Sequence, residues 1–307
     1  MKPVLSMNGT TESDSQTKPS TAAVLLIATL CIIFGGNTVA VKTSLSGFGP
    51  FTNAGIRFLI ASFLVGLWAV CTGRPLKIKR HLWPRVLLLT MLFFTQIVLI
   101  YLGMTKTLAS RGALISNLQP FFVLIFAHFF IAGDSISWKK FIGIAFGFIG
   151  AAFIFFDKNS INSNMLTGDF LIFAATLVWA INAIVTKRIV KDFRPYLLAI
   201  VPGFLSFPLF LICGYFFDEK MIFNINAQTL TALFYQSVIA AAIGYVLWTT
   251  MVRKYGAVTL HSYIFLMPVS GVFFGGLLLG EPVATLNILF ALIFIICGVI
   301  IVHSSRQ

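Results

Sequence analysis

The sequence contains two related halves, and each half has an odd number of long apolar segments. Three residues of the first half return 145 positions later: Asn37, Lys42 and Pro50 correspond to Asn182, Lys187 and Pro195. Further pairs follow at offsets of 144, 148 and 147: Tyr101 and Tyr245, Pro120 and Pro268, Gly133-Asp134 and Gly280-Glu281. Each half has five apolar segments, so the second copy must enter a membrane from the opposite side. Inverted repeats of this kind are the building plan of many secondary transporters.

The composition is that of an integral membrane protein. Of 307 residues, 58% are hydrophobic and only 10% are charged, whereas about a quarter of a soluble domain is charged. A helix that crosses the hydrocarbon needs roughly 20 apolar residues. The sequence therefore predicts an all-α membrane protein with ten transmembrane helices, at 22–43, 51–72, 84–104, 109–132, 139–156, 168–188, 196–217, 229–251, 257–279 and 284–302.

Basic residues lie mostly on one side of the predicted membrane. With a cytoplasmic N-terminus, 16 of the 22 Lys and Arg residues fall in cytoplasmic segments, 5 in outer segments, and Arg57 inside a span. This bias places both termini in the cytoplasm and explains the net charge of +13 without a nucleic-acid partner. We expect a multi-pass protein of the inner (plasma) membrane whose partners are the lipid bilayer and a small-molecule solute.

A polar segment separates the two halves. Residues 1–21 form a polar cytoplasmic tail without the basic-then-apolar order of a signal peptide. The repeats are expected at 22–157 and 168–303, with 158–167 as the linker. Because the chain contains both halves, we expect a monomer, with a dimer as the alternative. The four cysteines lie in separate spans without a CxxC pair, so we expect no metal, no disulfide and no cofactor.

Several motifs recur in the same order in both halves. FGGNTVAVK (34–42) is echoed by WAINAIVTK (179–187), NLQPFFVLIF (117–126) with GD (133–134) by FLMPVSGVFFGGLLLGEP (265–282), and Gly150 by Gly298. Over about residues 22–303 the chain resembles ten-helix permeases of the EamA type, in the drug/metabolite transporter superfamily. Asp134 stands where that family typically has Glu. The resemblance implies two inverted five-helix repeats around a central cavity, alternating access, and small organic solutes often moved outward, without fixing the cargo.

Polar side chains within the spans are candidates for solute contact, because in a bilayer they usually face the bundle interior or a water-filled path. Asn37 and Asn182 are the foremost, since the repeat places them at related depths on opposite sides of the midplane. Gln96 lies near the middle of span three, and Asn117 and Gln119 near the middle of span four, on different faces. The alternative role of these amides is to lock helix packing through hydrogen bonds to backbone.

Aromatic residues with a polar edge are candidates for contact with the apolar part of a solute. We expect Trp179, Tyr245 and Trp248 in this role, whereas Tyr101, close to a helix end, is expected to be an anchor at the membrane interface. Pro120 and Pro268 interrupt the backbone hydrogen bonds near the middle of equivalent spans. They are candidates either for gating or for a static bend.

The charged residues of the spans and their ends are expected to be structural. Arg57 lies about 9 Å into its span, from six residues at about 1.5 Å each. Its guanidinium could bind a carboxylate or phosphate, but we favour hydrogen bonds to carbonyls at helix ends. Asp134 and Glu281 end equivalent spans, and each could cap the helix that follows. Lys42 and Lys187, at helix ends, are expected to extend toward the interface.

No acidic residue is expected in the middle of a span, because all nine fall in the tail, loops or helix ends. An exchanger of protons for lipophilic cations would most simply use a buried acid, so a neutral, zwitterionic or anionic solute fits better. We expect an exporter of a small, amino-acid-like metabolite. The alternatives are efflux of drugs or lipophilic solutes, a channel, a lipid-handling protein or a membrane scaffold. An intramembrane enzyme would need clustered His and acids, so we expect no catalytic residues.

Overall fold

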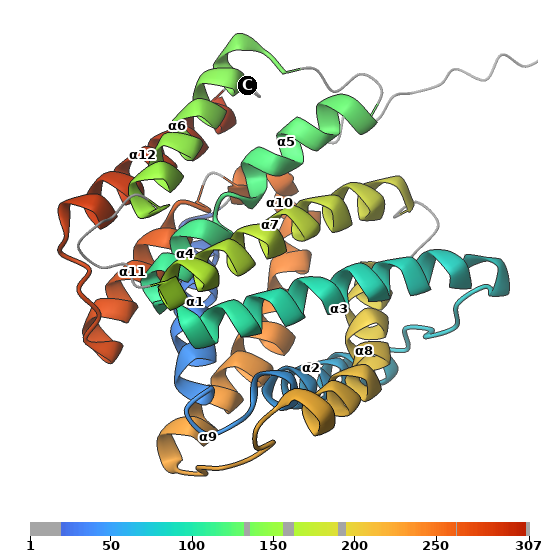
Figure 1. The fold of residues 1–307 in the computed structure, drawn as a ribbon. Coiled ribbons are helices and arrows are strands. Elements are labelled where there is room, and N and C mark those ends of the chain that lie inside the picture. The colour runs from blue at the N-terminus through green and yellow to red at the C-terminus, as the bar shows by residue number, and fades with distance from the viewer. Residues whose placement is uncertain (1–19, 132–135, 156–162, 190–194, 262, 305–307) are drawn as a thin grey trace, which may run out of the picture.

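The computed structural model describes residues 20–131, 136–155, 163–189, 195–261 and 263–304, and their regular elements are helices (Figure 1). These are α1 (Thr21–Ser44), α2 (Pro50–Cys71), the 3₁₀ turn η1 (Arg80–Leu82), α3 (Trp83–Lys106), α4 (Ala109–Ser116), α5 (Gln119–Phe130), α6 (Trp138–Phe155), α7 (Ser163–Ile189), α8 (Pro195–Phe217), α9 (Ala227–Phe234), the π-helix η3 (Tyr235–Gly244), α10 (Tyr245–His261), α11 (Leu266–Leu279) and α12 (Leu286–Ser304).

The helices account for the ten predicted spans. In the described part of the chain, eight helical segments are long and apolar enough to cross a membrane, and α11 and α12 are shorter apolar helices. Many large apolar side chains face outward, among them Phe63, Phe216 and Leu277. Such positions suit a lipid-facing surface, because a helix that is apolar on all sides belongs in a core or a membrane. Helix α7 begins at Ser163, inside the segment 158–167 that we expected to link the halves.

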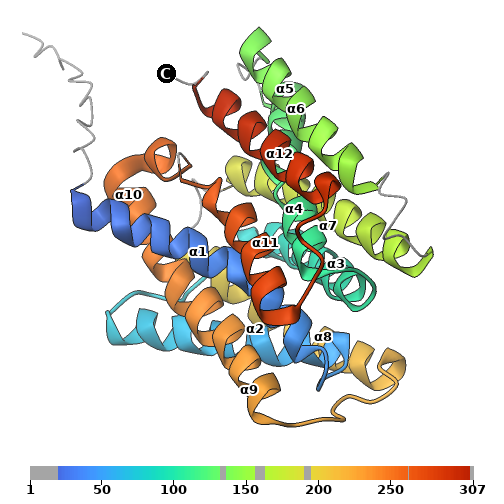
Figure 2. The same cartoon turned by 90° about the vertical axis from the view of Figure 1, so that its left-hand side faces the viewer.

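The packing of the helices follows the sequence repeat. Three pairs join a span to its repeat mate, namely α6 with α12, α2 with α8, and α4 with α11. Two further contacts have a counterpart in the other half. The contact of α3 with α7 corresponds to that of α1 with α9 and η3. The contact of α1 with α11 corresponds to that of α7 with α4 and α5. Figures 1 and 2 show α6 beside α12 on one flank and α2 beside α8 on the opposite flank. This is the arrangement of two inverted repeats around a common axis.

Small residues bring α6 and α12 close together. A Cβ atom added at Gly143 would lie 2.8 Å from the carbonyl oxygen of Gly298, and one added at Gly150 would lie 2.9 Å from that of Ala291. The offset of 148 pairs Gly143 with Ala291 and Gly150 with Gly298, so the two contacts are repeat mates. In lipid, helix association relies on such close packing of small residues.

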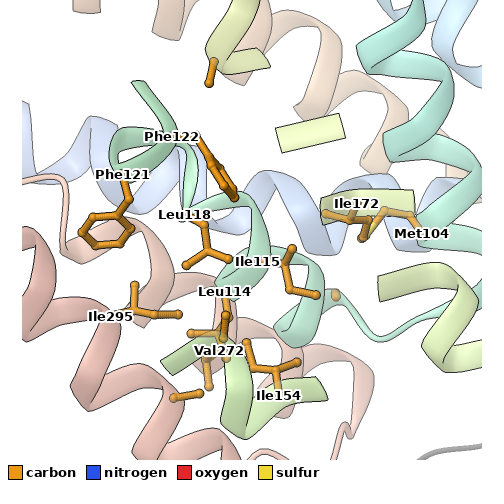
Figure 3. Close-up of a cluster of buried hydrophobic side chains, with 14 of the residues drawn as sticks. Met104, Leu114, Ile115, Leu118, Phe121, Phe122, Ile154, Ile172, Val272 and Ile295 are labelled. Carbon is orange, nitrogen blue, oxygen red and sulfur yellow. The ribbon is translucent and has the colours of Figure 1, made fainter. Parts of the chain in front are cut away.

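The two halves of span four lie at the centre of the largest apolar cluster. Leu114 and Ile115 of α4 and Phe121 of α5 are fully buried. Figure 3 shows them with side chains from α3, α6, α7, α11 and α12, including Met104, Ile154, Ile172, Val272 and Ile295. Such close-packed interiors are sensitive to changes of a single methylene group. Span four is therefore held from several sides at once.

Spans four and nine are both interrupted just before a proline. Helix α4 ends at Ser116 and α5 begins at Gln119, while α10 ends at His261 and α11 begins at Leu266. Pro120 and Pro268 lie in the first turn after each break, where a missing N–H leaves no helix bond unmade. The proline ring also disfavours a helical carbonyl four residues earlier, within the interrupted stretch. Each proline thus starts a second half-helix rather than kinking a continuous one.

The predicted boundary between spans eight and nine, at 251–257, is wrong. Helix α10 continues through these residues to His261, whereas the equivalent residues of the first half form the turn between α3 and α4. Thr107 in that turn is a weak helix former, but Arg253 and Lys254 in the second half are strong ones. The helix therefore continues in one half and stops in the other.

Gly143→Ala should lower the apparent melting temperature of the purified protein, because the new methyl group meets the backbone of α12. Overpacking of this kind costs about 1–3 kcal/mol. Gly66→Ala is the matched control, since a Cβ at Gly66 would meet nothing within 4 Å and Ala is the better helix former. Equal melting temperatures for the two variants would show that α6 and α12 do not pack as described.

Candidate functional site

A buried hydrogen-bond network joins four spans near one end of the bundle. Its members are Ser44 of α1, Asn53 and Arg57 of α2, Tyr101 of α3 and Gln236 of η3. At this end α1, α3, α8 and α11 stop and α2, α4, α9 and α12 begin; we call it the polar end. Polar groups in lipid must find partners inside the protein, and these five side chains do so across helices.

Gln236 is the centre of the network. Its side chain is fully buried; Oε1 accepts from the Tyr101 hydroxyl at 2.7 Å, and Nε2 donates to Ser44 Oγ at 2.8 Å and to Asn53 Oδ1 at 2.9 Å. Asn53 Nδ2 also donates to Ser44 Oγ at 2.7 Å. Gln236 lies in a π-helix, a rare element often found at functional sites. The sequence prediction missed Gln236, although a glutamine within span eight was a visible signal.

Arg57 brings a positive charge to this network. Its Nη1 donates to the Tyr101 hydroxyl at 3.3 Å and lies 3.5 Å from Gln236 Oε1, while its buried Nε has no partner among the described residues. We expected the guanidinium to bond helix-end carbonyls, but it bonds the side chains of Tyr101 and Gln236 instead. Tyr101 was predicted as an interface anchor, and this is wrong, because its side chain is only 1% exposed.

Two carboxylates cap helices at the polar end. Glu281 accepts from the backbone N–H groups of Ala109 at 2.6 Å and Ser110 at 2.8 Å, and so caps α4. We expected Glu281 to cap the helix that follows it, α12, but it caps the neighbour on which α11 packs. Asp218 likewise accepts from the N–H groups of Phe51 and Thr52 at the start of α2. Asp134, the repeat mate of Glu281, lies outside the described residues.

Lys42 binds the end of α3 on the other side of the same turn. Its Nζ donates to the carbonyl oxygens of Met104 at 2.7 Å and Thr107 at 2.6 Å, rather than extending to the interface as we expected. A cation at a helix C-terminus and an anion at a helix N-terminus both match the helix dipole. Lys42 of α1 and Glu281 after α11 therefore clamp the turn between α3 and α4 from both sides.

The connections at the polar end also pair with one another. The backbone N–H of Gly49 donates to the carbonyl of Met221 at 3.0 Å, and that of Phe223 donates to the carbonyl of Gly47 at 3.0 Å. The first loop belongs to the first repeat and the second loop to the second repeat. The two repeats are thus joined by backbone as well as by side chains at this end.

A buried ion pair links α4 to α7. Arg111 Nη2 and Nε donate to Asp169 Oδ2 at 2.5 and 3.0 Å, and the two side chains are 1% and 0% exposed. Arg111 also donates to the carbonyl of Ile154, and Thr107 donates to Asp169. We expected Asp169 at a helix end, but α7 begins six residues earlier, at Ser163. An acid is therefore buried inside a span, although it is neutralised by its partner.

The predicted amides have different environments. Asn37 Oδ1 and Gln96 Oε1 are buried without a partner among the described residues. Asn117 donates to the carbonyl of Ala113 at 2.7 Å, which is the packing role we named as the alternative. Asn182 Oδ1 faces the Thr186 hydroxyl at 3.4 Å, and Gln119 is half-buried. The two unpaired acceptors, in α1 and α3, are therefore the amides best able to receive a solute.

The predicted aromatic residues have different surroundings. Trp248 packs edge-on against Phe34 of α1, with ring centres 5.7 Å apart, and Tyr245 is half-buried at the start of α10. Trp179 is 40% exposed. Their contact with a solute stays a prediction.

An apolar groove of about 580 Å³ lies between α1, α9 and α11. It is lined by Gly36, Val39, Ala40 and Thr43 of α1, Ala227, Gln228, Thr231 and Ala232 of α9, Tyr235 of η3, and Phe274 and Leu278 of α11. None of the predicted site residues lines it. Among the described residues there is also no cluster of His, Cys, Asp or Glu that could hold a metal ion.

Comparison with known proteins places this arrangement in a family. A model of the EamA-like transporter family matches the chain twice, over residues 21–156 and 166–304. The chain belongs to this family. It is therefore a permease of the EamA type in the drug/metabolite transporter superfamily, a multi-pass membrane protein and a transporter.

Several curated relatives of this EamA-type permease span nearly its whole length. The uncharacterized transporter YvbV of Bacillus subtilis is 27% identical over 293 residues, which are 94% of each chain. A probable amino-acid metabolite efflux pump of Escherichia coli is 25% identical over 281 residues, 88% of this chain and 91% of that one. A crystal structure with 14% sequence identity has a TM-score of 0.68 over 92% of this chain and 96% of its own. This last likeness shows the fold alone.

Arg111→Met should strongly destabilise the permease, because it leaves the Asp169 carboxylate buried without its counter-charge. Breaking one partner of such a pair costs about 3–5 kcal/mol. The double variant Arg111→Met, Asp169→Leu should recover part of the loss, since replacing both charges by apolar groups is often nearly neutral. Thermal unfolding in detergent would measure both, and a double variant less stable than the single one would contradict the pairing.

Proposed function

We propose that this permease is a secondary transporter that exports a small, amino-acid-like metabolite across the inner membrane by alternating access. The observation that carries the proposal is the repeat-symmetric packing of two inverted halves, whose spans four and nine are broken at equivalent places. In secondary transporters, broken helices near the midplane commonly surround the solute, and one repeat moves against the other. The names of the relatives add that some family members handle amino-acid metabolites.

The polar end is the outer gate in this proposal. The distribution of basic residues supports a cytoplasmic location for both termini, and in that orientation the polar end faces outward. Glu281, Asp218 and the paired loops join the halves there, so these contacts must break before a solute can leave. The conformation is then one in which the outer gate is shut.

The solute is proposed to meet Asn37 and Asn182, with Gln96 and the aromatic edges around them. Asn37 lies seven residues before the end of α1, and Asn182 lies seven residues before the end of α7. The two amides therefore have equal depths from opposite ends. Each offers a donor and an acceptor. We further propose that the permease works as a monomer, since one chain supplies both halves.

A second candidate is efflux of lipophilic solutes. The apolar groove between α1, α9 and α11 favours it, because apolar walls suit a ligand that arrives from lipid. Under this alternative the groove, and not the amides, would decide which solutes are moved.

The function is tested by comparing metabolites in the medium of cells that express the wild type or Asn37→Ala, Asn182→Ala at equal membrane levels. We expect a solute that accumulates outside only with the wild type, and several-fold less of it with the variant. Gly66→Ala serves as the matched control, because Gly66 faces open space, and it should export like the wild type.

Three other outcomes would count against parts of the proposal. Equal export by the wild type and the double variant would keep an exporter but discard the amide site. Export of only lipophilic solutes would favour the second candidate. Media identical to those of cells without the permease would contradict export.

A further inference from the structure

We infer that Arg57 and Asn37 together recognise the carboxylate and the ammonium group of an α-amino acid. The inference rests on the proposed function, and it names the substrate class of the same site. It gives Arg57 a role beyond the structural one that the sequence suggested.

Arg57 has no carboxylate partner among the described residues. Its Nη1 bonds the hydroxyl of Tyr101 and the amide oxygen of Gln236, and its Cζ lies 4.9 Å from the centre of the Phe58 ring, so all three partners are neutral. The opposite side of the guanidinium, which carries Nε, has no partner among the described residues. A cation inside a membrane is costly unless it is paired, and a buried donor without an acceptor is rare. A planar guanidinium with free neighbouring donors fits the two oxygens of a carboxylate.

Asn37 supplies the complementary group. Its Oδ1 is a buried acceptor without a described partner, and a carbonyl oxygen suits a donor such as an ammonium group. Arginine has only donors and cannot bind an ammonium group, while an amide oxygen is only an acceptor and cannot bind a carboxylate. The unpaired donor of Arg57 and the unpaired amide oxygen of Asn37 therefore suit the carboxylate and the ammonium group of one zwitterion.

The helix geometry places Asn37 and Arg57 on the faces of α1 and α2 that carry the network. Asn37 precedes the last residue of α1 by seven, and Arg57 follows the first residue of α2 by seven, which is about 10 Å along each helix. Asn37 is on the same face of α1 as Ser44, two turns away, and Arg57 is on the same face of α2 as Asn53. Ser44 and Asn53 are hydrogen-bonded at 2.7 Å, and both helices pack on η3. Asn37 therefore lies about two turns, and Arg57 about one turn, from the Ser44–Asn53 pair, both toward the middle of the bundle.

The repeat makes this recognition one-sided. Asn182 is the mate of Asn37, but the mate of Arg57 is Pro202, which has neither a charge nor an N–H donor. A carboxylate is therefore bound only from the side of the polar end. The side chain of the amino acid would then extend away from the polar end, toward α7 and α8.

The test uses the full-length permease, purified in detergent, and its stabilisation by each of the twenty standard amino acids in turn. For the amino acid that raises the melting temperature most, affinity is then compared with that of its carboxamide and of its des-amino acid. We expect the wild type to bind the amino acid about tenfold to a hundredfold more tightly than either analogue, as is typical of lost hydrogen bonds to charged groups.

The variants separate recognition from folding. Arg57→Gln should remove the preference for the acid over the carboxamide, Arg57→Lys should keep part of it, and Asn37→Ala should remove the preference over the des-amino acid. Gly66→Ala is the matched control, because a Cβ at Gly66 meets nothing within 4 Å, and it should keep both preferences. If Arg57 is only structural, Arg57→Gln will lose stability without a change in either ratio.

Two results would overturn the inference while the proposed function stands. One is metabolite export by cells together with no stabilisation by any of the twenty amino acids. The other is an acid-to-carboxamide ratio in Arg57→Gln equal to that of the wild type. Absence of any exported solute would instead count against the proposed function itself.

Discussion

The absence of water in the hydrocarbon core requires each polar group of a span to find its partner within the protein, and this constraint shapes the polar end. Arg111 is neutralised by Asp169, Lys42 by the last carbonyls of α3, and Glu281 by the first N–H groups of α4. Helix ends leave N–H groups and carbonyl groups unpaired, so charged side chains from other spans bind there. Where the partners belong to different repeats, as Glu281 and α4 or Asp218 and α2 do, the contacts that satisfy the backbone also hold the two repeats together.

An inverted repeat gives two ends with the same backbone plan, but here the two ends differ in chemistry. The mates of Asn53, Arg57 and Gln236 are Leu198, Pro202 and Leu92. Near the opposite end, Leu198 packs in an apolar cluster with Leu82, Val86 and Leu89. Opening the polar end must break several hydrogen bonds, each with a net worth of about 0.5–1.5 kcal/mol. Opening the other end must separate apolar surfaces, which in lipid have no comparable drive to associate. Duplication thus supplied the symmetry, and later substitutions made the ends unequal.

Much of the fold could be predicted because the lengths of the spans and the offset between the repeats are visible in the sequence alone. Ten apolar segments and an odd number per half are enough for the inverted plan. The site was less accessible, because it depends on contacts between distant residues. Nothing near Glu281 in the sequence shows that it caps α4, 172 positions away, and Tyr101 resembles any tyrosine near a helix end until Gln236 is placed beside it. The α10 boundary was missed because helix propensity, not hydropathy, decides whether 252–256 forms a turn. Contact of the remaining predicted residues with a solute stays a prediction.

Arg57 connects solute recognition to the outer gate in this arrangement. Its Nη1 is bonded to Tyr101 and close to Gln236, and Gln236 in turn holds Ser44 and Asn53 at the ends of α1 and α2. A carboxylate that binds at Nε pulls on the same guanidinium whose Nη1 bonds the network, because the group is rigid and planar. A ligand shifts a conformational equilibrium only by its difference in affinity for the two states. If the carboxylate binds more tightly when Arg57 is not bonded to Tyr101 and Gln236, then the bound solute weakens the network that joins the four spans. The solute itself would then loosen the gate through which it leaves.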